Sequence, residues 1–137
     1  MKDDKDWPVN RPILRLEDMM LRYAELLVEE GKIMEAVAYV NDIRKRAGCD
    51  EVNTVSAADA LKLIKRERRI ELMGEGVRWF DLVRWGEWQT EIQSLFDSYH
   101  NPDGTDKNNV KTGRYLYPIP LNQLNVTPGL YKQNEGY

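Results

Sequence analysis

Residues 64–86 read IKRERRIELMGEGVRWFDLVRWG, a segment that mixes charged groups with large apolar side chains. On a helix of about 100° per residue, the apolar positions of residues 57–73 share one predicted core face. These positions are Ala57, Ala60, Leu61, Ile64 and Leu72. Arg68 and Glu71 fall within the same face, and Glu67 lies at its margin. Because a charge removed from water needs a partner, the pattern predicts partly buried ion pairs.

More charges follow, interleaved with aromatic rings. Arginine suits such a setting because its planar group pairs with carboxylates through two hydrogen bonds and stacks on aromatic faces. We therefore predict one ion-pair lattice walled by indole rings. Its eight members are Glu67, Arg68, Glu71, Arg78, Trp79, Asp81, Arg84 and Trp85.

The ion-pair lattice has two interpretations. It is either a structural joint between helices or a site, with carboxylates for acid–base chemistry or arginines for an anionic ligand. An enzyme using Glu67, Glu71 or Asp81 is supported only by the density of carboxylates. The chain has a single His, no activated-nucleophile pattern and no metal-ligand cluster near the lattice. We therefore favour the structural interpretation and predict no catalytic, cofactor-binding or metal-binding residue.

The composition indicates an ordinary globular protein. The 137 residues are 42% apolar and 31% charged, and we expect a single domain spanning residues 1–137. The net charge of −3 gives no electrostatic reason to bind nucleic acid. The single cysteine, Cys49, excludes an internal disulfide. The polar start, Met1 to Asp6, lacks the apolar run of a signal peptide, so we expect a start made within a longer protein.

Residues 13–99 are predicted to be helical. Apolar residues at i, i+3, i+4, i+7, i+8 and i+11 predict a helix that closes at Gly31. They are Leu16, Met19, Met20, Tyr23, Ala24 and Leu27. A second helix ends at Gly48, and its apolar side consists of Ile33, Val37, Val40, Ile43 and Ala47. The pair forms a hairpin in tetratricopeptide-like register, and one such repeat needs neighbours to cover its apolar face.

Three further helices are expected after this hairpin. Ser56 opens the first with a capping-box pattern that uses Asp59, and this helix runs to about Met73. The next begins near Val77. Apolar positions from Trp88 to Tyr99 then predict another amphipathic helix.

The remaining segments are predicted to be irregular. Residues 1–12 form an extended lead-in, residues 100–114 a polar surface loop and residues 115–137 an extended, Pro/Gly-rich tail. Asn101, Asp103 and Asp106 suggest a calcium loop, but the spacing lacks the glycine and glutamate that such loops require. The YLYPIP segment can supply a brief strand or an extended strip.

Three motifs resemble the SusD/RagB family, the outer-membrane glycan-binding lipoproteins of Bacteroidetes. The helix pair resembles that family in RLEDMMLRYAELLVEEGK and AVAYVNDIRKRAG, and the tail does so in YPIP and QNEGY. The remaining motif resembles the family's C-terminal hallmark. It matches at Glu67, Arg68, Arg69, Glu71, Leu72, Glu75, Gly76, Arg78, Asp81, Leu82, Arg84 and Trp85.

The resemblance implies the mainly α, C-terminal fragment of a SusD-like α-α superhelix. It also implies a complete protein that is lipid-anchored at the outer membrane, with an anchor that we expect to lie outside this chain. That protein would capture an oligosaccharide or polysaccharide for a SusC-like TonB-dependent transporter, without catalysis, cofactor or nucleic acid.

The family's sugar-contacting aromatics lie mostly upstream, so the candidate contacts here are only Trp7, Trp88 and Tyr99. As the first member of an apolar stripe, Trp88 fits a core role better. The alternative function is a helical, tetratricopeptide-like protein–protein interaction module without sugar binding.

Overall fold

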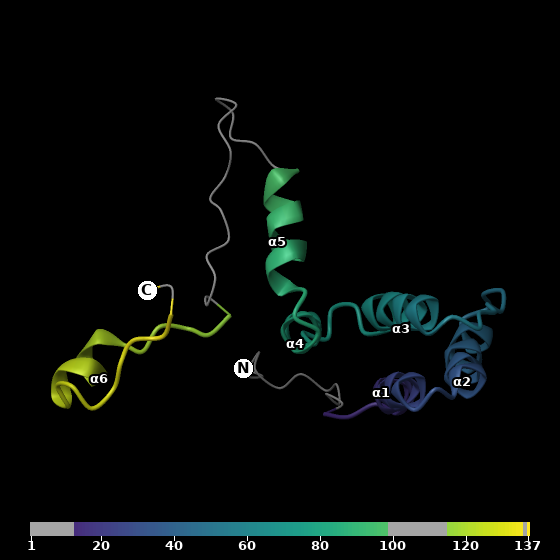
Figure 1. Cartoon of the computed structure of the whole chain (residues 1–137), viewed down its shortest axis with the longest axis horizontal. Coiled ribbons are helices and arrows are strands. Elements are labelled where there is room, and N and C mark those ends of the chain that lie inside the picture. Colours follow the sequence, from purple (N-terminus) through teal and green to yellow (C-terminus); the bar gives the residue numbers. More distant parts are fainter. Residues whose placement is uncertain (1–12, 99–114, 136) are drawn as a thin grey trace, which may run out of the picture. The chain divides into compact units, whose positions relative to one another are not determined.

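The computed structural model describes residues 13–98, 115–135 and 137, and these residues form six helices and no strand (Figure 1). The mainly α fold predicted from the periodicity is therefore confirmed. The chain divides into two compact units, one ending at Gly76 and one beginning at Val77, and each is described by itself. None of the described helices is both long enough and apolar enough to span a membrane.

The first unit begins with the predicted helical hairpin. Helix α1 (Leu16–Glu29) and helix α2 (Ile33–Arg46) pack against each other. Between them, the Gly31 N–H donates to the Val28 carbonyl and the Lys32 N–H to the Leu27 carbonyl, a Schellman motif. Gly31 has φ +79°, a conformation that glycine adopts without the strain of a side chain.

Helix α3 (Ala57–Glu71) packs against both helices of the hairpin (Figure 1). The Ser56 Oγ accepts the Asp59 N–H at 3.3 Å, so the predicted N-cap is confirmed. The reciprocal half of the capping box is replaced, because the Ser56 N–H donates to the Thr54 Oγ1 instead. The core between the three helices consists of Leu21, Ala24, Leu27, Val28, Ala36, Val37, Val40, Ile43, Ala60 and Ile64.

The predicted apolar face of α1 is wrong at half of its positions. Helix α1 carries apolar residues on more than one side, and the side that faces α3 also carries the charged residues Asp18 and Glu25, both buried. The opposite positions lie in water in the described structure. We call this set the outer stripe of α1: Leu16, Met19, Tyr23 and Leu26, exposed by 71%, 50%, 48% and 55%. Ala47 and Ala57, predicted to lie in the core, are also exposed.

The second unit contains three shorter helices. Helix α4 (Arg78–Arg84) begins one residue after the predicted start, and helix α5 (Trp88–Asp97) follows it after a turn at Gly86. Helix α6 (Leu121–Val126) lies in the tail and was not predicted. It occupies the short interval between Pro120 and Pro128, which excludes a long helix but allows a helix of one to two turns.

The YLYPIP segment forms no strand among its described residues and is held by side-chain amides instead. The Gln133 Oε1 accepts the Ile119 N–H at 2.8 Å, and the Gln133 Nε2 donates to the Ile119 carbonyl at 3.0 Å. The Asn134 Nδ2 donates to the Tyr117 carbonyl at 2.6 Å. We call these three hydrogen bonds the amide clamp. They join the two ends of the tail segment that includes α6.

Candidate functional site

Arg68 is the most deeply buried charged side chain among the described residues, with 1% of its surface exposed. It extends from α3 to α1, where its Nη1 lies 2.8 Å from the Asp18 Oδ1 and 3.2 Å from the Asp18 carbonyl. Its Nε lies 3.8 Å from the Glu25 Oε1. Arg22 also donates to the Asp18 Oδ1 at 3.0 Å. These contacts join α1 to α3 through charges that are removed from water.

The pKa of Asp18 shows that this cluster holds charge. Burial by itself raises the pKa of the Asp18 carboxyl, but hydrogen bonds from Arg68 and then Arg22 outweigh it, and the pKa lies below its usual value. A general acid or base works best with a pKa near the operating pH. The buried aspartate at the centre of this cluster therefore fits an ion pair and does not fit acid–base catalysis.

Two glutamates of α3 extend the same network to α2. Glu67 pairs with Arg44 of α2. Glu71 pairs with Arg46 of α2 and with Arg15, which precedes α1. In the described part of the chain, no buried side-chain nitrogen or oxygen lacks a hydrogen-bond partner. A buried charge network is stabilising only when its groups are satisfied, and this one meets that condition.

The partners that α1 and α2 supply to the network were not predicted from the sequence. Asp18 and Glu25 lie seven residues apart, in line with Leu21 and Val28, and these four positions share one helix face. The spacing was visible in the sequence. It was overlooked because the opposite stripe of α1 carries no charge and looks more like a core face.

The lattice members in the second unit form their own contacts. Asp81 is 2% exposed and accepts a hydrogen bond from the Arg84 Nε at 2.9 Å. The Arg84 guanidinium lies over the Trp85 ring, 4.7 Å from its centroid. Arg78 lies 5.8 Å from the same ring centroid and pairs with Glu91 of α5 at 3.2 Å. These are the kinds of contact that the interleaved sequence predicts. The joining of all eight residues into one lattice stays a prediction.

Aromatic side chains gather in the second unit. The Trp79 and Trp88 ring centroids lie 5.8 Å apart, and those of Trp88 and Tyr115 lie 6.1 Å apart. A cavity of about 440 Å³ lies beside these rings. It is lined by Trp79, Phe80, Tyr115, Leu116, Tyr117 and Tyr137, a set that we call the aromatic cavity. This set was not predicted from the sequence, because Tyr115 follows α5 only after a long interval.

Of the three predicted glycan contacts, only Trp88 lies within the described residues. Trp88 is half-buried, with its ring close to those of Trp79 and Tyr115, and α5 has no fully buried residue, so the expected core role of Trp88 stays a prediction. Trp7 and Tyr99 lie outside the described residues, as does the loop with Asn101.

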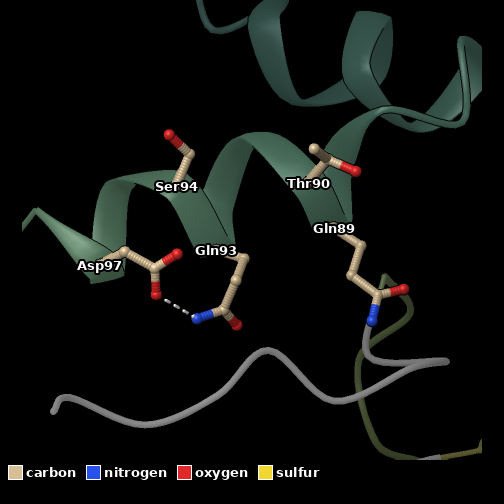
Figure 2. A pocket seen from close by; sticks show the side chains of 5 residues that line it. All are labelled: Gln89, Thr90, Gln93, Ser94 and Asp97. Carbon is tan, nitrogen blue, oxygen red and sulfur yellow. Dashed lines mark hydrogen bonds between the residues drawn. The ribbon is translucent and has the colours of Figure 1, made fainter.

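A polar hollow of about 420 Å³ lies along α5 (Figure 2). It is lined by Gln89, Thr90, Gln93, Ser94 and Asp97. Gln89, Gln93 and Asp97 project from the same side of the helix, and the Gln93 Nε2 donates to the Asp97 Oδ1 at 2.7 Å. The hollow offers amide, hydroxyl and carboxylate groups. Within the described ranges, no group of three or more His, Cys, Asp or Glu side chains is placed to hold a metal ion.

Comparison with known proteins identifies the family. The family model described as the SusD family matches residues 5–137. The chain belongs to the SusD family. Two solved structures support the helical fold. A SusD superfamily protein from Bacteroides vulgatus matches with a TM-score of 0.73 and 24% identity over 90% of this chain and 27% of its own. Surface glycan-binding protein A from Bacteroides thetaiotaomicron matches with a TM-score of 0.69 and 28% identity over 94% of this chain and 25% of its own.

A curated relative supports the same family. SusD-like protein P25 of Formosa agariphila is 33% identical over 93% of this chain, and the matched part covers 25% of that protein. The chain thus spans a quarter or less of the length of the curated SusD-like relatives that it matches.

Proposed function

We propose that this chain is the C-terminal part of a cell-surface protein that captures oligosaccharides for import through a SusC-like TonB-dependent transporter. The observation that carries the proposal is the correspondence of 94% of the chain to a protein described as surface glycan-binding protein A. The complete protein would be held at the outer membrane by a lipid anchor. Its role would be to bind and deliver the glycan without breaking a bond.

In this function the ion-pair lattice is a structural element. Arg68 joins α1 to α3, and Glu67 and Glu71 join α3 to α2, so the lattice would hold the helices in one arrangement. Trp7, Trp88 and Tyr99 remain proposed glycan contacts. Of these, Trp88 is packed between two rings, which supports a role in shaping the surface behind a ligand.

The first test is made on the native gene product in its own cells. Intact-mass measurement and membrane fractionation should find a membrane-bound product several times heavier than 16.1 kDa that begins at a lipidated cysteine. The purified product should then be retarded by at least one polysaccharide in a native gel. A soluble product that begins at Met1 and is retarded by none would contradict glycan capture.

The second candidate function is a helical protein–protein interaction module, which the outer stripe of α1 favours. Its four apolar side chains lie on one helix face and are exposed in the described structure. A protein partner that binds this stripe tightly, combined with no affinity for any polysaccharide, would support the module and exclude glycan capture.

A further inference from the structure

The aromatic cavity has the composition of a small-ligand site. Its volume of about 440 Å³ falls in the range of roughly 300–1,000 Å³ that such sites occupy. Five of its six lining residues are aromatic, and none carries a charged side chain. Tyr117 is 90% exposed and Phe80 is 68% exposed, so flat aromatic faces are left in water here.

The contacts around the cavity keep its aromatic wall in place. The Trp88 ring packs against two of the lining residues, Trp79 and Tyr115. The amide clamp holds the backbone of Tyr117 through Asn134, and that of Ile119 through Gln133. A surface that is ordered before binding loses less conformational entropy when a ligand arrives.

We propose that the aromatic cavity binds the apolar face of a neutral sugar ring in a glycan, with Tyr117 as the main stacking residue. The proposal rests on the proposed function, and it assigns that function to particular residues. One face of a pyranose presents C–H groups, which suit an aromatic ring, while tyrosine hydroxyls can hydrogen-bond to the sugar hydroxyls. An acidic or sulfated sugar would call for arginine or lysine, and neither lines the cavity.

The experiment uses the complete gene product and native-gel retardation by soluble starch, laminarin, xyloglucan, galactomannan and xylan. Tyr117→Ala should raise the Kd for the retarding polysaccharide by about tenfold, because a stacking face is lost. Tyr117→Phe keeps the ring and should stay within about threefold of the unmodified protein. Tyr131→Ala is the matched control, because Tyr131 is a tail tyrosine that is 57% exposed and does not line the cavity. It should bind like the unmodified protein.

The outcomes separate this proposal from the proposed function. If the unmodified protein is retarded but Tyr117→Ala is retarded equally, the sugar site is overturned and glycan capture stands. Equal losses in Tyr117→Ala and Tyr117→Phe would overturn stacking. If none of the five polysaccharides retards the unmodified protein, both proposals fall. Should Tyr117→Ala fail to fold, Phe80→Ala replaces it, with the same tenfold loss expected and unchanged binding as the contrary result.

Discussion

At the scale of single residues, Arg68 is the clearest example of a buried charge. Its guanidinium loses almost all contact with water, and the carboxylates of Asp18 and Glu25 replace that contact. Replacing a whole buried ion pair by apolar groups is often neutral, whereas removing one partner leaves the other charge buried and unpaired. Single substitutions at this cluster should therefore destabilise the fold more than paired apolar substitutions do.

Arg68→Ala should lower the free energy of unfolding by roughly 3–5 kcal/mol, because Asp18 and Glu25 lose a buried counter-charge. Urea denaturation followed by circular dichroism measures the change. Arg69→Ala is the matched control on the same helix, since Arg69 is exposed and its removal should cost less than about 0.5 kcal/mol. Equal stability of the two variants would show that Arg68 is not needed to hold α1 and α3 together.

The contribution of Asp18 should depend on pH. Its pKa in the folded protein lies below the ordinary value of 3.8, so folding favours the ionised form. The stabilisation is therefore complete at pH values above 3.8. It is lost as the pH falls below 3.8 and passes through the pKa that Asp18 has in the folded protein. Asp18→Asn removes the titrating group. The difference in unfolding free energy between the unmodified protein and this variant should shrink as the pH falls below about 4. A pH-independent difference would contradict the assignment.

At the scale of the helices, periodicity and end signals located most elements but not every buried face. The glycines at the ends of α1 and α2 and the cap at Ser56 act locally, so they could be read from neighbouring residues. The buried face of α1 depends on Arg68, fifty positions later in the chain, and periodicity cannot reveal such a partner. Helix α6 was not predicted, because Pro120 and Pro128 limit the length of a helix between them but do not indicate whether one forms.

The N-cap of α3 provides a test at this scale. Ser56→Ala should lower the free energy of unfolding by about 1 kcal/mol, because the Asp59 N–H loses its acceptor. Ser56→Asp keeps an acceptor at the same position and should stay within a few tenths of a kcal/mol. Thermal unfolding of the three proteins measures both values. Similar losses in the two variants would indicate that the hydroxyl acts elsewhere.

At the scale of the whole molecule, the outer stripe of α1 is apolar surface that one helical hairpin cannot cover. Stacked helical repeats bury such faces against neighbouring repeats. The chain spans a quarter or less of the length of its curated SusD-like relatives. We therefore expect further helices of the same protein to cover the stripe, which the sequence of this segment alone could not place.

Met19→Ser tests this expectation in two contexts. Met19 is 50% exposed in the described structure, so the substitution should change the stability of this 137-residue chain by less than about 0.5 kcal/mol. In the complete gene product it should cost roughly 2 kcal/mol or more, because a buried methionine would be lost. Urea denaturation of both proteins, with and without the substitution, gives the comparison. Equally small effects in both would mean that the stripe stays in water.

The amide clamp also limits the number of backbone N–H groups in the tail that could pair with a strand of another molecule. Extended segments rich in aromatic side chains attract other chains when their backbone groups are unpaired. In Pro118–Ile119–Pro120 the prolines have no N–H, and the remaining one, on Ile119, is accepted by Gln133. An approaching strand therefore finds no free backbone donor across these three residues. The hydrogen bond from Ile119 to Gln133 thus removes the last backbone donor that another strand could use across Pro118–Ile119–Pro120.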